Sequence, residues 1–179
     1  MDVREHSTIR EGAVTGVIGA VVLAVWYFIT DAAAGTPLHT PNMLGRMLFG
    51  AGLRPAVGQI DAGAVIGYTL IHFAVFILIG MGLALLVHLA IRETSLRMGV
   101  WIGLLLALGF FAGHVYMLGL ASGERIAPWS VIVGSLLAVL GMAGYLWRAH
   151  PRLSRSFQEQ PLGSEVPPPP HPPEHPHAA

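Results

Sequence analysis

The sequence contains no cysteine and no lysine, and few charged residues of any kind. Without cysteine the chain cannot form a disulfide framework, a Cys-ligated zinc site, an iron–sulfur cluster or a thiol nucleophile. Without lysine it cannot form a Schiff base with a carbonyl substrate. Ten basic residues balance ten acidic ones, so no net charge attracts nucleic acid. These absences exclude several classes of enzyme, and we expect no nucleic-acid partner.

Charged residues make up only 11% of the chain, whereas hydrophobic residues make up 54%. Soluble domains carry about 25% charged residues, so this composition indicates a membrane protein. A helix needs about 20 apolar residues to cross the hydrocarbon core of a bilayer. Four stretches meet that requirement and predict spans over about residues 12–31, 62–91, 98–121 and 127–147. We therefore predict an all-α polytopic membrane protein whose four transmembrane helices form an up-down bundle.

Arginines flank the predicted spans unevenly, and cytoplasmic flanks carry the excess of positive charge. Residues 1–11, the turn after the second span and the segment after the fourth share one side and hold most of the ten arginines. Only Arg46, Arg54 and Arg125 fall on the other side. This distribution predicts a membrane domain over residues 12–148 of a multi-pass protein in the bacterial inner membrane, with both termini in the cytoplasm.

Two segments outside the predicted spans differ in composition. In the outer loop, residues 32–61, Thr40 and Pro41 stand as an N-cap and first helical residue, and apolar residues follow at helical spacing. This pattern predicts a short interfacial helix over about 41–50. Residues 149–179 are rich in proline and histidine, which predicts a disordered cytoplasmic tail. Its side chains could bind a metal only loosely, through His171, Glu174, His175 and His177.

Small residues recur at intervals of four along the predicted spans. In a membrane such rows let helix backbones approach closely and mark packing faces. The first span has one row and the third has rows on two sides, which together comprise the packing residues Gly12, Gly16, Ala20, Ala24, Gly99, Gly103, Gly109 and Gly113. These rows either close a monomeric bundle or, in part, face a partner. Rows on two sides of one helix favour a partner.

Two histidines lie inside the predicted spans at matching depth. His72 and His114 are at nearly equal distances from the turn near Thr94, about 30 Å along antiparallel helices at 1.5 Å per residue. Two neutral imidazoles on facing helices can ligate a haem b iron or another metal, or hydrogen-bond a quinone. Tyr68 precedes His72 by about one helical turn, and its ring would suit a flat conjugated ligand. The candidate cofactor-binding residues are therefore His72, His114 and Tyr68.

The same residues also allow a purely structural role. A histidine inside a membrane satisfies its ring nitrogens with a neighbouring hydroxyl, such as that of Tyr68, or with a backbone carbonyl. His and Tyr near the outer interface need no further role, so the structural interpretation includes no cofactor. The sequence does not decide between the cofactor role and the structural role.

Motifs of the common enzyme classes are absent from the sequence. It has no glycine-rich phosphate loop, nucleophile elbow or HExxH zinc motif, so we expect no catalytic residue and no metal site in the bundle. The function that remains is a non-catalytic accessory or structural subunit of a larger respiratory or photosynthetic complex. Such a subunit acts by packing against other membrane subunits or itself, and by contacting lipid. The alternative is a redox-cofactor protein that uses His72 and His114.

Part of the chain, from Gly12 to Gly80, resembles a group of small four-span bacterial membrane proteins that carry no assigned activity. The residues that carry the resemblance are the Trp-Tyr-Phe run at 26–28, Asp31, the Gly-Thr-Pro run at 35–37, and residues 68–72. None of them is a mechanistic signature. The resemblance implies a four-helix membrane fold and no particular function.

Overall fold

A computed structural model describes residues 8–49, 59–92, 96–122 and 127–151, and these form an all-helical protein. The helices are α1 (Thr8–Ala33), α2 (His39–Phe49), α3 (Ala62–Arg92), α4 (Arg97–Ser122) and α5 (Pro128–Ala149). The structure has a helix, α2, where the sequence predicts a short one over about 41–50, and α2 begins two residues earlier than expected. The predicted tail lies outside the described residues from residue 152 onward.

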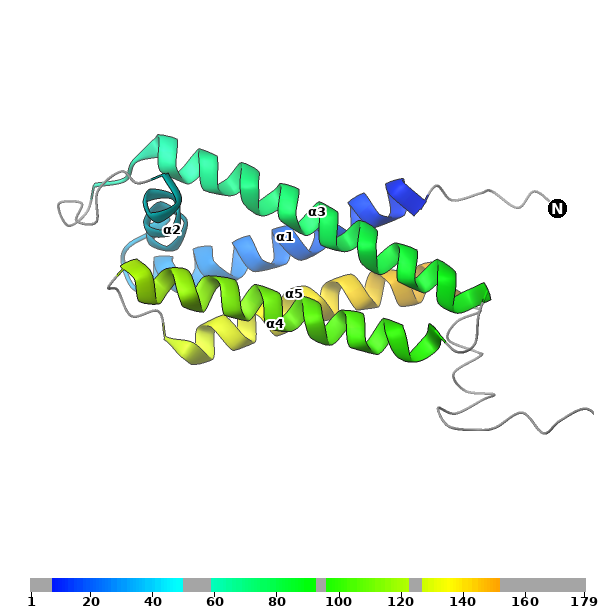
Figure 1. The fold of residues 1–179 in the computed structure, drawn as a ribbon. Coiled ribbons are helices and arrows are strands. Elements are labelled where there is room, and N and C mark those ends of the chain that lie inside the picture. Colours follow the sequence, from blue (N-terminus) through cyan, green and yellow to red (C-terminus); the bar gives the residue numbers. More distant parts are fainter. Residues whose placement is uncertain (1–7, 50–58, 93–95, 123–126, 152–179) are drawn as a thin grey trace, which may run out of the picture.

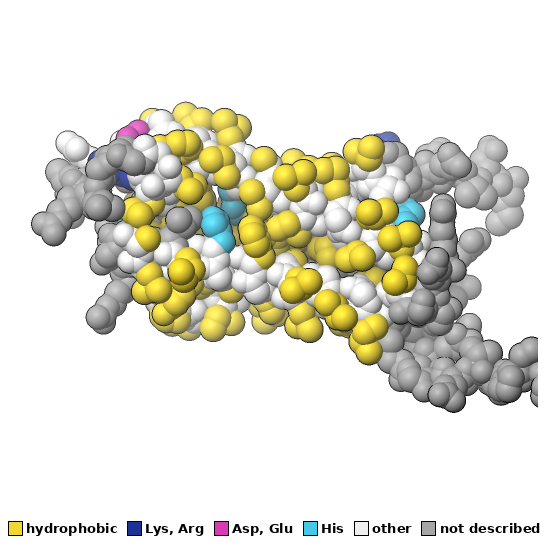
Figure 2. Space-filling view, viewed as in Figure 1, with side chains coloured by type: hydrophobic (Ala, Val, Ile, Leu, Met, Phe, Trp, Pro, Cys, Tyr) yellow, Lys and Arg dark blue, Asp and Glu magenta, His cyan; other side chains and the backbone are white. Residues whose placement is uncertain are grey.

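Four of the helices are long and apolar enough to cross a membrane, as the sequence predicted. Even the shortest of them, α5, has 22 residues and a length of about 33 Å, against a hydrocarbon core of about 30 Å. Figure 2 shows hydrophobic side chains spread along the helical body, whereas acidic and basic side chains lie near its ends. The chain is therefore a helical bundle with four candidate membrane-spanning helices.

The first helix begins earlier than the predicted span, at Thr8 rather than Gly12. It therefore includes Arg10 and Glu11, and the Glu11 side chain is only 3% exposed. At the other end of α1, backbone hydrogen bonds close the turn into α2, from Gly35 N to the Ala32 carbonyl (3.0 Å) and from Thr36 N to the Asp31 carbonyl (2.9 Å). Gly35 has a φ of +75°, a conformation that glycine adopts without steric cost.

In the bundle, α1 contacts α3 most extensively and α5 next, while α2 lies across one end and contacts α3 and α4 (Figure 1). The start of α1 and the end of α3 share the opposite end of the molecule (Figure 1). Backbones approach closely where α1 crosses α3, since a Cβ on Gly80 would lie 2.8 Å from the Gly16 Cα. Farther along, Phe76 of α3 stacks on Phe111 of α4, with ring centroids 3.9 Å apart.

Candidate functional site

A cavity of about 480 Å³ opens between α1, α2 and the start of α5. This volume falls within the range of about 300–1,000 Å³ that is typical of ligand sites. Polar side chains from α1, α2 and α5 contribute to its lining, together with apolar ones. The lining residues are Tyr27, Thr30, Asp31, Ala34, His39, Thr40, Met43, Ala127, Trp129 and Ser130.

Asp31 holds α2 over this cavity. Its carboxyl oxygens accept hydrogen bonds from the backbone amide of Thr40 (2.7 Å) and from the Thr40 hydroxyl (2.8 Å), and the side chain is buried. Amides in the first turn of a helix have no partner within that helix, and the helix dipole favours an acidic group there. Asp31 therefore does for α2 what an N-cap residue does, although it belongs to α1.

A second connection joins α2 to α3. The Asn42 side chain donates a hydrogen bond to the Gln59 carbonyl (3.1 Å) and accepts one from the backbone amide of Asp61 (2.9 Å). Asp61 in turn accepts a hydrogen bond from the amide of Ala64 in the first turn of α3 (3.1 Å). The first part of α2 is thus tied to α1 through Thr40 and to the start of α3 through Asn42, which keeps one wall of the cavity in place.

One polar atom that belongs to the cavity lining has no hydrogen bond. The Tyr27 hydroxyl is buried and has no hydrogen-bond partner among the described residues. Burying a hydroxyl without a partner costs about 1–3 kcal/mol, so a ligand that bonds to it gains affinity. With the acceptor Asp31 one turn away on α1, the cavity offers both a donor and an acceptor to a small amphipathic molecule.

The predicted cofactor residues come together on α3 and α4. The Tyr68 ring lies 5.8 Å from the His72 ring and stacks parallel to the His114 ring at 6.5 Å. The Phe110 ring stacks on the His114 ring at 6.1 Å. His72 Nε2 lies 3.1 Å from the Ala20 carbonyl oxygen, which can only accept, so Nε2 carries the hydrogen. His72 therefore uses a carbonyl on α1 rather than the Tyr68 hydroxyl.

Beside this group lies a smaller cavity of about 120 Å³. His72, Tyr68 and Tyr27 contribute to its lining, together with residues of α1 and α2. Its volume lies below the usual range for ligand sites, so it accommodates only part of a ligand.

The small residues on α1 and α4 have different surroundings. Gly12, Gly16 and Ala20 are buried, and the two glycines face α3, whereas Ala24 is exposed. On α4, Gly103 faces Leu83 and Leu86 of α3. A Cβ would meet no described atom within 4 Å at the other three predicted positions on α4, which are Gly99, Gly109 and Gly113.

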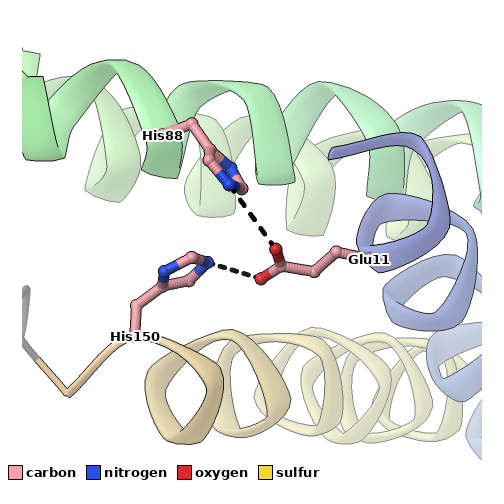
Figure 3. A group of neighbouring side chains, drawn as sticks. All are labelled: Glu11, His88 and His150. Atoms are coloured by element: carbon pink, nitrogen blue, oxygen red, sulfur yellow. Dashed lines mark hydrogen bonds and ion pairs between the residues drawn. The ribbon is translucent and has the colours of Figure 1, made fainter. Parts of the chain in front are cut away.

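Sequence reasoning missed a further polar cluster at the opposite end of the bundle (Figure 3). Glu11 of α1, His88 of α3 and His150 after α5 point toward one another there. His150 Nε2 lies 2.5 Å from Glu11 Oε1, and His88 Nε2 lies 3.7 Å from Glu11 Oε2. A signal for it was present in the sequence, because Glu11 and His150 flank predicted spans and His88 lies near the end of one, all on the same predicted side of the membrane.

No family model matches the chain, and no curated protein and no solved structure shows significant similarity to it. The class that the fold defines is a helical bundle with four candidate membrane-spanning helices.

Proposed function

We propose that the protein is a non-catalytic accessory subunit of a larger respiratory or photosynthetic complex in a bacterial inner membrane. In this proposal its four long helices form an up-down bundle with both termini in the cytoplasm, and α2 lies at the outer interface. It acts by contact: one helix face packs against a partner, while the cavity under α2 holds a lipid or cofactor. The arginine distribution supports the orientation.

The glycines on the outer face of α4 carry this proposal. Gly109 is exposed and Gly113 is half-buried, and a Cβ added to either would meet no described atom within 4 Å. Glycine inside a helix costs about 1 kcal/mol relative to alanine. Where the bundle itself requires close approach, as at Gly16 and Gly80, glycine has a packing reason. Gly109 and Gly113 lie one turn apart on an outer face, and a partner helix that packs closely there would give them the same packing role.

Large apolar side chains surround these glycines on α4. The strongly exposed ones include Leu105 (67%), Leu106 (68%) and Met117 (64%), and α4 is the least buried of the four candidate spans. Small residues between large ones let a partner helix approach the backbone closely at Gly109 and Gly113. We call this surface, Gly109 and Gly113 with the exposed side chains beside them, the α4 face.

The test is purification of the tagged protein from its native membrane in a mild detergent, followed by mass spectrometry of the proteins that copurify. We expect stoichiometric subunits of one complex, and their loss in the variants Gly109→Leu and Gly113→Leu. Gly144→Leu is the matched control, because Gly144 on α5 is exposed like Gly109 and a Cβ there would also meet no described atom within 4 Å. Recovery of the wild-type protein alone, or only with further copies of itself, would contradict an accessory role.

A second candidate function is binding of a redox cofactor, haem b or a quinone, by His72, His114 and Tyr68. The observation that favours it is the position of the Tyr68 ring beside both imidazoles. The adjoining 120 Å³ cavity is too small for a whole haem. It therefore favours a quinone, whose ring would enter the cavity while its tail stays in the lipid.

The cofactor candidate is tested by the absorption spectrum and by quinone analysis of the protein isolated from its native membrane. It predicts a haem band or a bound quinone in the wild type and the loss of either in His72→Ala and His114→Ala. Equal cofactor content in the wild type and both variants would rule out these residues as ligands.

A further inference from the structure

The cluster of Glu11, His88 and His150 joins three helices at the end of the bundle opposite α2 (Figure 3). Glu11 lies in the first turn of α1, His88 near the end of α3, and His150 immediately after α5. One ligand atom from each residue lies within 4.8 Å of the others. The side chains are sheltered, with exposed fractions of 3% for Glu11, 27% for His88 and 14% for His150.

The hydrogen bonding of His88 shows which of its nitrogens faces the cluster. His88 Nδ1 lies 2.8 Å from the Ala84 carbonyl oxygen, which can only accept, so Nδ1 carries a hydrogen. In a neutral ring, Nε2 then presents its lone pair, and this nitrogen faces Glu11 Oε2. Metal-binding histidines commonly have this arrangement, in which one ring N–H is held by a carbonyl while the other nitrogen ligates the ion.

The Glu11 carboxyl group is only partly satisfied by the protein. Its Oε1 is paired with His150, whereas Oε2 is buried and has no hydrogen-bond partner among the described residues. His88 Nε2, at 3.7 Å, is too far from Oε2 for a hydrogen bond. A lone pair on Nε2 and an acidic oxygen thus face each other across a gap, an arrangement that a cation between them stabilises.

The donor set indicates which cation fits. Two imidazole nitrogens and one carboxyl oxygen suit a first-row transition metal such as Zn²⁺, whereas Ca²⁺ and Mg²⁺ prefer oxygen ligands alone. In a tetrahedral zinc site, bonds of about 2.0–2.2 Å place the ligand atoms about 3.3 Å apart. One ligand atom from each of the three residues lies within 4.8 Å of the others, so side-chain rotations that draw them together by about 1–1.5 Å would reach that separation.

We propose that Glu11, His88 and His150 bind one Zn²⁺ ion and that the ion holds the ends of α1, α3 and α5 together. The two imidazole rings lie nearly perpendicular, at 83° with centroids 4.9 Å apart, so the nitrogens approach the ion from different directions. Three protein ligands leave a fourth position for water. This proposal replaces the expectation from the sequence of no metal site in the bundle, and it is independent of the α4 face.

The test measures Zn²⁺ binding to the full-length protein in detergent by competition with a chromophoric chelator. The affinity tag must contain no histidine, and His171, His175 and His177 are replaced by alanine in every sample, because the tail carries its own donors. We expect one equivalent of Zn²⁺ on this background. Loss of a group that merely orients a ligand weakens metal affinity about 10–100-fold. Removal of a ligand in Glu11→Gln, His88→Gln or His150→Gln should therefore cost at least about tenfold.

His39→Gln is the matched control, since it makes the same change at an exposed histidine on α2, at the opposite end of the bundle. Circular dichroism shows whether each variant keeps its helices. X-ray absorption of the zinc-loaded protein does not depend on any ligand variant and should show two imidazole nitrogens in the coordination shell. Absence of stoichiometric binding, equal affinity in all variants, or a shell without imidazole would overturn the proposal.

Discussion

Asp31, near the C-terminal end of α1, binds both the backbone amide and the hydroxyl of Thr40 in the first turn of α2, at 2.7 and 2.8 Å. The two residues are nine positions apart, and the chain between them turns through Gly35 at φ +75° and Leu38 at φ +66°. A positive φ is uncommon for leucine, so the surrounding hydrogen bonds must hold it. This one contact therefore fixes the direction in which α2 leaves α1.

Replacement of Asp31 by alanine should destabilise the protein by about 1.5–3 kcal/mol, the usual range for hydrogen bonds to a charged group. Thr40→Val removes only the hydroxyl and should cost about 1 kcal/mol, while Thr40→Ser keeps the hydroxyl and should cost less. The free energy of unfolding is measured by titration with a denaturing detergent. If Asp31→Ala unfolds at the same midpoint as the wild type, the carboxyl group does not hold α2.

The sequence predicted the number of long helices because each apolar stretch is long enough to be unambiguous. It did not predict where α1 begins. Glu11 was assigned to the membrane flank because acidic side chains are costly in hydrocarbon. In the structure Glu11 belongs to α1 and its side chain is buried, where His88 and His150 from distant parts of the chain lie against it. Apolar pattern alone cannot reveal such a partner, because the pairing depends on which helices adjoin.

The row of small residues on α1 was predicted to run from Gly12 to Ala24, but only Gly12, Gly16 and Ala20 are buried. A helix has 3.6 residues per turn, so each step of four advances about 40° around its axis. Three steps carry Ala24 about 120° away from Gly12, and it lines the small cavity on the surface instead. Leu23 and Tyr27 continue the buried face. A spacing of four therefore predicts a packing row only over about two turns.

Gly80→Ala should destabilise the bundle by about 1–3 kcal/mol, which is typical of overpacking. A Cβ there would lie 2.8 Å from the Gly16 Cα, and a backbone atom cannot rotate away as the end of a side chain can. Gly82→Ala is the matched control on the same helix, because a Cβ at Gly82 meets no described atom within 4 Å. It should be neutral or stabilise the helix by up to about 1 kcal/mol. Equal stability of the two variants would contradict the close crossing.

Tyr27→Phe tests the cavity under α2. Removal of a buried hydroxyl that has no described partner relieves a desolvation penalty, so the detergent-purified protein should be about 1 kcal/mol more stable. If the cavity holds a lipid through this hydroxyl, native mass spectrometry should show less retained lipid in the variant. Tyr116→Phe, at an exposed position on α4, is the control and should change neither quantity. A fall in stability of Tyr27→Phe without bound lipid would show that the hydroxyl has a partner.

His72→Phe and His114→Phe test the structural contacts of the two histidines. His72 Nε2 donates to the Ala20 carbonyl at 3.1 Å, and interhelical hydrogen bonds in membranes contribute about 0.6–2 kcal/mol, so His72→Phe should lose that amount. His114 stacks on Tyr68 and Phe110, which a phenylalanine ring can also do, so His114→Phe should change stability little. The free energies of unfolding are compared in cofactor-free protein. A large loss in His114→Phe would show that its imidazole makes a contact that a phenylalanine ring cannot replace, and no loss in His72→Phe would contradict the hydrogen bond to Ala20.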